Sequence, residues 1–489
     1  MNNILYLPLD ERPCNYYFPL KLLNGNPKYN LLTPNKNVLG KKKNPSKFEE
    51  IKKFLLENAK NAKIAVISLD QLLYGGIVPS RLHHLSYEEI KMRLSLLEEI
   101  KKINKNLILY CFVLIMRCPA YSSSDEEPDY YKICGKEIYE FGVKMDKGEE
   151  IPLTIKEKVA PYLDDYLKRR KTNFDIILDV LKMTDTIDFL CIPQDDSSPF
   201  GFTTMDKRKI FKEIEDNNYD VLIYPGADEV GMSLISRSIN TLENDSKMIY
   251  VDYMYQESQN LVPAYENVSL KDTVFKQIIV SGNKLTTIPE KADIILFANY
   301  DKYQQLEASK KEKSILDIDV AIKQVERIKN TIKKEKTIGL VDKYYVNGGN
   351  LKYLQLLSKE IDIFSLDAYA GWNTSSNSLG TVIAATTISS YFKNIPSLKM
   401  FLAERLYDDC LYQGEERFRI TNYELPKLGY NYFDVKEEKG EVANLIAQSL
   451  TLSAKTNLPV LNQRYEIKNL TMPWHRMFEI FLELKYVKD

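Results

Sequence analysis

Short apolar runs that end in an acidic or amide residue alternate with helical stretches from Ile4 to Phe392. The run 189–192, for example, is followed by Pro193, Gln194, Asp195 and Asp196. Such a run is typical of a buried strand in a parallel sheet. Alternation of strands with helices predicts an α/β protein, built as a (β/α) barrel or as doubly wound parallel-sheet units.

The pattern also suggests how the chain is divided. We expect a barrel-like α/β catalytic half over residues 1–245 and a second α/β unit over residues 246–393 that completes the site. Residues 394–489 have helical patterns and polar loops without another run of this kind. They predict a helix-rich C-terminal region.

Polar residues after the strands are the candidates for a functional site. In parallel α/β proteins the carboxyl ends of the strands meet at one rim, where ligands bind. A single acid in this position also suits a helix N-cap, but its recurrence along the chain favours a site. The candidates for substrate binding are Asp10, Arg12, Asp70, Arg81, Arg117, Asp342, Asn347, Asp367, Tyr369, Trp372, Asn373 and Asn377.

Two further features of these candidates bear on their role. Neither Asp70 nor Asp367 abuts an obvious helix start, so capping does not account for them. Trp372 lies among amide and hydroxyl side chains, which suits a sugar ring with a face to stack on and edges to bond, although a core anchor has the same composition.

Four acids are candidates for acid–base catalysis: Asp195, Asp196, Asp228 and Glu229. Crowded carboxyl groups shift one another's pKa, so that one can donate a proton while another stays ionised. The sequence therefore predicts a glycoside hydrolase that acts on a small or amino-sugar glycan and needs no cofactor. Two alternatives are a Mg²⁺- or Mn²⁺-dependent hydrolase or phosphoryl-transfer enzyme, because these ions favour oxygen ligands, and a non-catalytic carbohydrate-binding protein.

Composition excludes several other classes. Lys and Arg total 67 against 68 for Asp and Glu, which gives no basic face for nucleic acid. Three His leave little material for a zinc site or a Ser-His-Asp triad, and no phosphate-binding glycine motif occurs. No apolar run reaches membrane-spanning length. Six Cys without a C-x-x-C pair, and no leader at the N-terminus, predict a cytoplasmic protein. From the candidate site and the composition we expect a sugar-like small-molecule substrate and no nucleic-acid or membrane partner. Oligomeric state is not indicated.

Four segments in order carry a resemblance: LPLDERPCNYYFP, DQLLYGGIVPSR, PGADEVGM and DAYAGWNTSSNSLGT. They resemble a bacterial family known only as domain-of-unknown-function family 4127, and the likeness runs from Leu7 to about Thr381. The resemblance implies a soluble bacterial protein and brings no established activity.

The Asp195–Asp196 pair is similar to the adjacent acids of glycosidases that use the substrate's acetamido group as nucleophile. This analogy implies that Asp195 orients the acetamide and that Asp196 is the general acid. In other glycosidases two carboxylates lie across the scissile bond on different strands, and Asp228 or Glu229 would then partner Asp196.

Overall fold

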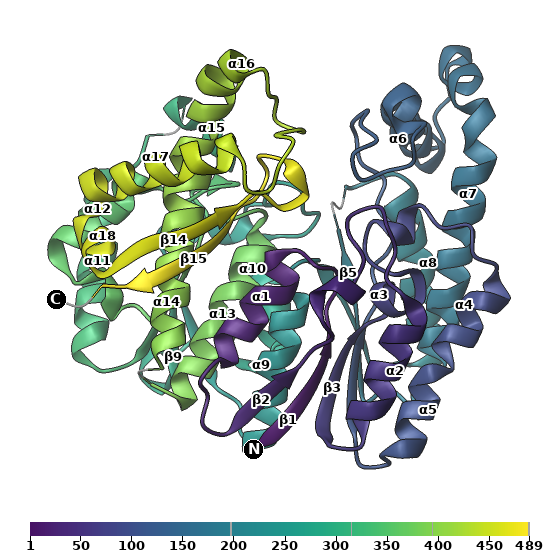
Figure 1. The fold of residues 1–489 in the computed structure, drawn as a ribbon, viewed down its shortest axis with the longest axis horizontal. Helices are drawn as coiled ribbons and strands as arrows, with labels where there is room; N and C mark the ends of the chain where they lie inside the picture. Colours follow the sequence, from purple (N-terminus) through teal and green to yellow (C-terminus); the bar gives the residue numbers. More distant parts are fainter. Residues whose placement is uncertain (196–197, 314, 394, 488–489) are drawn as a thin grey trace. The chain divides into compact units, whose positions relative to one another are not determined.

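A computed structural model describes residues 1–195, 198–313, 315–393 and 395–487 (Figure 1). The chain forms two compact units. The first unit contains residues 1–16, 27–234 and 265–267, and the second contains residues 17–26, 235–264 and 268–489. Division into domains at residues 245 and 393 stays a prediction.

A six-stranded parallel sheet forms the centre of the first unit, in the order β2-β1-β3-β4-β5-β6. Its strands are β1 (Asn2–Leu7), β2 (Tyr29–Leu32), β3 (Ala62–Ser68), β4 (Ile108–Phe112), β5 (Phe189–Gln194) and β6 (Val221–Pro225). Since every pair is parallel, all the carboxyl ends lie at one edge of the sheet.

Helices cover both faces of this sheet. One face packs its apolar side chains, such as Leu5 and Ile67, against α2 (Phe48–Ala59), α5 (Leu96–Ile103), α7 (Leu153–Leu181) and α8 (Phe202–Asn217). The opposite face carries Tyr6, whose hydroxyl donates to the carbonyl of Asn15 in α1 (Pro13–Leu23) at 2.7 Å. The same hydroxyl leaves no room for a Cβ at Gly231 in α9 (Val230–Glu243). The remaining helices of this part are α3 (Leu69–Tyr74), α4 (Tyr87–Leu94), α6 (Tyr131–Lys147) and the 3₁₀ turn η2 (Pro79–Arg81).

The second unit contains a five-stranded parallel sheet in the order β13-β11-β9-β7-β8. Its strands are β7 (Met248–Tyr253), β8 (Lys284–Leu285), β9 (Ile294–Asn299), β11 (Thr337–Asp342) and β13 (Ala368–Ala370). A separate parallel pair joins β10 (Leu306–Glu307) to β12 (Tyr345–Val346).

Two successive residues of β11, which point to opposite faces, show how the helices cover this second sheet. Gly339 packs directly against Val382 and Thr386 of α13 (Ser375–Tyr391). Leu340 points to the other face, into a core shared with α11 (Ile318–Lys333) and α12 (Leu351–Glu360). Helix α10 (Leu270–Val280) completes this part.

The C-terminal region is mostly helical, as expected. It comprises α14 (Pro396–Arg405), the π-helix η7 (Leu406–Glu416), α15 (Arg417–Arg419), η8 (Ile420–Glu424), α16 (Leu425–Leu428), α17 (Glu441–Asn457) and α18 (Pro459–Arg464). It ends in an antiparallel hairpin of β14 (Tyr465–Thr471) and β15 (Phe481–Tyr486), which the sequence did not suggest. Leu406 and Ile446 share the core of Leu340, so this region belongs to the second unit.

The α/β prediction is therefore confirmed. Of the two arrangements expected, doubly wound units are the one observed, because in the described residues the edge strands of each sheet do not pair with one another. Across the same residues, no helix combines the length and the apolar character needed to cross a membrane.

Candidate functional site

The carboxyl edge of the first sheet gathers most of the predicted residues of that unit. They come from five strands: Asp10 and Arg12 after β1, Asp70 and Arg81 after β3, Arg117 after β4, Asp195 after β5, and Asp228 and Glu229 after β6. These residues lie up to 219 positions apart in the chain, between Asp10 and Glu229. Two groups of ion pairs organise them.

The first group, the Arg12 cluster, consists of Asp10, Arg12, Asn15 and Asp228. Arg12 Nε and Nη2 donate to Asp10 Oδ2 at 2.8 and 2.7 Å, and Nη1 donates to Asp228 Oδ2 at 3.2 Å. Asn15 Nδ2 donates to Oδ1 of Asp10 at 3.0 Å and to Oδ1 of Asp228 at 3.2 Å. All four side chains are buried. One guanidinium group and one amide therefore tie the end of β1 to the end of β6.

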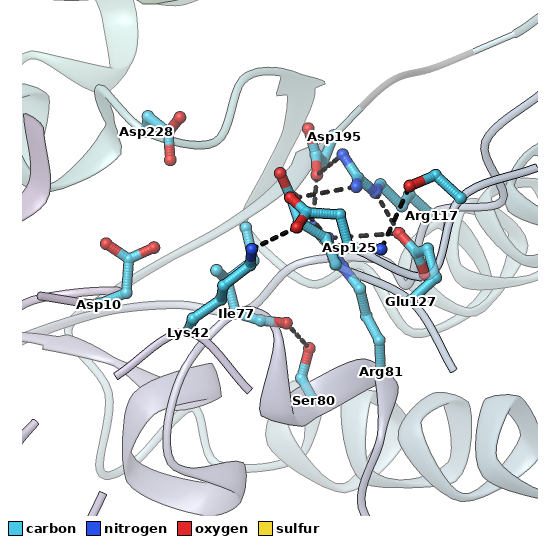
Figure 2. Close-up of polar contacts among 12 residues, drawn as sticks. Asp10, Lys42, Ile77, Ser80, Arg81, Arg117, Asp125, Glu127, Asp195 and Asp228 are labelled. Atoms are coloured by element: carbon cyan, nitrogen blue, oxygen red, sulfur yellow. Dashed lines mark hydrogen bonds and ion pairs between the residues drawn. The ribbon is translucent and has the colours of Figure 1, made fainter. Parts of the chain in front are cut away.

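The second group, the Arg81–Arg117 cluster, consists of Arg81, Arg117, Glu126, Glu127 and Asp195 (Figure 2). Asp195 Oδ2 accepts from Arg81 Nη2 at 2.8 Å and lies 3.5 Å from Arg117 Nη1. Glu127 Oε1 accepts from Arg117 Nε at 2.8 Å and from Arg81 Nη1 at 3.4 Å. Glu126 Oε2 contacts the same two arginines at 3.0 and 3.2 Å. The two arginines thus gather three carboxylates from two separate segments.

The loop between β4 and α6 supplies two of these carboxylates, and sequence reasoning missed them. Glu126 and Glu127 belong to the acidic run 125–129, which the sequence presents only as a polar loop. Its other acids, Asp125 and Asp129, pair with Lys42 and Lys43, and Figure 2 shows the Lys42–Asp125 pair. The acidic run itself, together with the arginines that follow the strands, was the signal available in the sequence. A run of acids does not reveal which Arg or Lys side chain each acid contacts.

Asp70 corrects one expectation. Ser68 caps α3 through its side chain, and Asp70 lies in the first turn of that helix, so it does follow a helix start. Its Oδ2 accepts from the backbone N–H of Leu114 at 2.9 Å. Burial raises the pKa of Asp70 to about 7, and the hydrogen bond from Leu114 and the charge of Arg81 oppose this rise. Asp70 is therefore a carboxyl group that can hold a proton near neutral pH.

The other predicted catalytic acids differ in what surrounds them. Glu229 is buried and accepts from the backbone N–H of Ala227 at 3.0 Å. Asp196 lies outside the described residues, so its relation to Asp195 is not part of this geometry. Gln194, the last residue of β5, is 2% exposed, and neither atom of its side-chain amide has a partner among the described residues.

In the second unit, Asp342 ends β11 and is held by three donors. Asn299 Nδ2 donates to Oδ1 at 2.8 Å, and Oδ2 accepts from the backbone N–H of Asn350 at 2.7 Å and from Tyr369 Oη at 3.0 Å. Burial raises the pKa of Asp342 to about 6, and these hydrogen bonds oppose the rise. The neighbouring Lys343 is buried and donates to the carbonyl of Asn373 at 2.7 Å.

The π-helix η7 places a further buried acid, Asp409, at this edge, and sequence reasoning missed it. Asp409 Oδ2 accepts from the backbone N–H of Gly371 at 2.9 Å, and its Oδ1 accepts from Arg405 at 2.7 Å. Burial raises the pKa of Asp409. Glycines pack closely beside this contact: a Cβ at Gly371 would lie 3.0 Å from the backbone of Gly349, and a Cβ at Gly349 would lie 2.0 Å from Tyr369 Oη. Runs of π-helix are rare and often mark functional positions.

Asp367 does not join this edge, so the expectation that it closes a strand is wrong. Residues 363–365 form a 3₁₀ turn, and β13 begins at Ala368, so Asp367 precedes its strand. Its carboxylate accepts from the backbone N–H of Ile338 at 2.8 Å and from Ser389 Oγ at 2.6 Å. Ile338 is near the start of β11, so Asp367 lies at the amino edge of the sheet.

The remaining predicted binding residues follow the strands of the second sheet. Asn347 Nδ2 donates to Glu307 Oε2 at 3.1 Å, and the backbone N–H of Asn347 donates to the carbonyl of Asn373 at 3.1 Å. Asn377 lies in the first turn of α13. Trp372 is 8% exposed, and its indole N–H donates to Thr381 at 3.1 Å. Its ring is therefore buried in this structure rather than presented as an open stacking surface.

Within the described ranges, no group of three or more His, Cys, Asp or Glu side chains could hold a metal ion. The carboxylates of the Arg12 cluster and of the Arg81–Arg117 cluster instead pair with arginines.

Comparison with known proteins supplies a family. The model of the family described as a protein of unknown function (DUF4127) matches residues 4–483. A comparison with curated proteins finds no match. The match extends the resemblance of the four motifs through the C-terminal helices and into the final hairpin. The chain therefore belongs to the DUF4127 family of proteins of unknown function.

Proposed function

We propose that the protein is a glycoside hydrolase that cleaves a small or amino-sugar glycan at the carboxyl edge of the first sheet. The observation that carries this proposal is the pair Asp70 and Asp195, which share Arg81 as a neighbour but differ in environment. Asp70 is buried and can hold a proton near neutral pH. Asp195 is partly exposed and bound by guanidinium groups. Glycosidases need one carboxyl group of each kind.

The roles follow from these environments. Asp70 serves as the proton donor, and Asp195 serves as the carboxylate that activates water or attacks the sugar. Arg81 and Arg117 hold Asp195 in place. Asp10 and Asp228 orient Arg12, and Glu229 supports the loop after β6. Asp196, as the neighbour of Asp195, is retained as an alternative general acid.

Turnover of a panel of 4-nitrophenyl glycosides tests this proposal. We expect Asp195→Asn and Asp70→Asn each to lower kcat by about 10²-fold or more, as for loss of a general acid or base. Asp196→Asn decides whether Asp196 or Asp70 donates the proton. Asp185→Asn is the matched control, because Asp185 is an exposed acid before the amino end of β5.

Three outcomes would oppose the proposal. Normal turnover by Asp195→Asn would remove Asp195 from the reaction. Loss of turnover with EDTA and recovery with Mg²⁺ would favour the metal-dependent hydrolase. Saturable sugar binding with no turnover of any glycoside would favour a carbohydrate-binding protein.

The proposed substrate is a small sugar-like molecule, and the proposed location is the cytoplasm. All six Cys lie in the described residues, are buried and form no disulfide, as suits a reducing compartment. Fractionation of the native cells, with detection of the protein by antibody, tests the location.

A further inference from the structure

The Arg81–Arg117 cluster contains three carboxylates and two guanidinium groups. It also contains an acceptor without a donor. Glu127 is 0% exposed, and its Oε1 meets both arginines, but its Oε2 has no partner among the described residues. A buried acceptor without a donor is costly, and it indicates a missing N–H or O–H.

The parts of the cluster that a ligand can reach are carboxylates. The side chains of Asp195 and Glu126 are 17% and 18% exposed, whereas those of Arg81 and Arg117 are 3% and 9% exposed. A ligand that approaches this cluster therefore meets acceptor oxygens and negative charge before it meets the guanidinium groups.

We propose that the Arg81–Arg117 cluster binds a protonated primary amine of the substrate, such as the free amino group of a hexosamine. An ammonium group brings three donors and one positive charge, which match the carboxylates that the cluster presents. An N-acetylated amino sugar brings a neutral amide with one donor, and glucose brings hydroxyl groups without charge. The choice of a sugar as the bearer of the amine rests on the proposed function.

Gln194 adds a contact of a different kind. It directly precedes Asp195 in β5, and both of its unpartnered amide atoms are buried. Its donor and acceptor together suit a pair of hydroxyl groups at the carboxyl edge of the sheet.

Isothermal titration calorimetry with D-glucosamine, N-acetyl-D-glucosamine and D-glucose at pH 6.5 tests the proposal. We expect D-glucosamine to bind at least tenfold more tightly than the other two sugars. The preference should weaken as NaCl is raised, because salt screens charge pairs at a partly exposed site. Glu126→Gln and Asp195→Asn should each lower the preference about tenfold, and Asp185→Asn should leave it unchanged.

Equal affinity for D-glucosamine and D-glucose, or an unchanged preference in Glu126→Gln, would overturn the amine site. Tighter binding of putrescine than of D-glucosamine would overturn the hexosamine assignment. Circular dichroism and thermal melts of Glu126→Gln show whether a loss of preference has a local origin, and a Tm within a few degrees of the parent protein supports it.

Failure of this inference is distinct from failure of the proposed function. Hydrolysis of N-acetylated glycosides without any preference for the amine would contradict the amine site and support the proposed hydrolase. Preference for D-glucosamine without turnover of any glycoside would support the amine site and contradict the proposed hydrolase.

Discussion

Arg81 donates a hydrogen bond of 2.8 Å to Asp195, although 114 positions separate the two residues. The bond links the segment after β3 to the end of β5 across the intervening strand β4. It places a charged carboxylate beside a guanidinium group at the edge where ligands of parallel sheets bind. The predictions below probe this edge and the corresponding edge of the second unit.

Removal of the guanidinium group from the Arg12 cluster should destabilise the protein strongly. Arg12→Ala leaves the buried carboxylates of Asp10 and Asp228 without a cation, bonded by Asn15 and, for Asp10, by the backbone N–H of residue 12. Loss of one partner of a buried pair costs about 3–5 kcal/mol in the free energy of unfolding. Urea titration followed by circular dichroism measures this cost. Lys171→Ala, which breaks an exposed pair with Asp175, is the control and should cost less than about 0.5 kcal/mol.

Asp70 should make stability depend on pH. Its pKa in the folded protein is about 7, against a usual value of 3.8, so between these pH values the folded state binds more protons than the unfolded state. Stability from this group is therefore greatest below about pH 4 and falls as pH rises towards 7, by about 1.4 kcal/mol per pH unit.

The variant Asp70→Asn isolates this contribution. We expect the free energy of unfolding of the parent protein, minus that of Asp70→Asn, to fall by on the order of 3 kcal/mol between pH 5 and pH 7. Urea titrations at several pH values give the difference. A difference that is constant over this range, or that rises, contradicts the raised pKa.

A side chain at Gly349 should disturb the second sheet edge. A Cβ there would lie 2.0 Å from Tyr369 Oη and 2.9 Å from Asp342 Oδ2. We expect Gly349→Ala to lower the free energy of unfolding by about 2–3 kcal/mol through overpacking. Gly148→Ala is the comparison, because it has positive φ but open space, and it should cost only about 1 kcal/mol. Equal costs for the two variants would mean that Tyr369 and Asp342 do not pack tightly against Gly349.

Trp372 offers a test of its predicted contact with sugar. Because the ring is buried and its N–H is bonded to Thr381, Trp372→Phe should cost about 1–3 kcal/mol of stability. We expect its affinity for D-glucosamine to stay within twofold of the parent value. A tenfold loss of affinity with unchanged stability would return Trp372 to the role of a stacking surface.

Much of the fold could be predicted because it follows from local periodicity. The helical pattern of residues 153–182 folds as α7, Leu153–Leu181, and the apolar run 189–192 lies within β5. Asp367 shows where local patterns fail. Residues 361–366 carry four apolar side chains, but residues 363–365 fold as a 3₁₀ turn, and the following Ala368–Ala370 pairs with β11 instead.

For a related reason, only some residues of the candidate site could be predicted from the sequence. Acids that directly follow a strand are marked by the strand itself, as with Asp195 and Asp342. Glu127 and Asp409 are defined by partners far along the chain, Arg81 and Gly371, and by a loop and a π-helix whose positions no local pattern indicates. Long-range pairing of this kind is set by tertiary packing.

The acidic run after β4 has a practical consequence. Its flanking acids form ion pairs, Asp125 with Lys42 at a partly buried position and Asp129 with Lys43 at an exposed one. Concentrated salt screens the charges and so weakens such ion pairs. We therefore expect crystals grown from ammonium sulfate to show weaker electron density for residues 125–129 than crystals grown from polyethylene glycol. We also expect proteases to cleave this segment faster in concentrated salt.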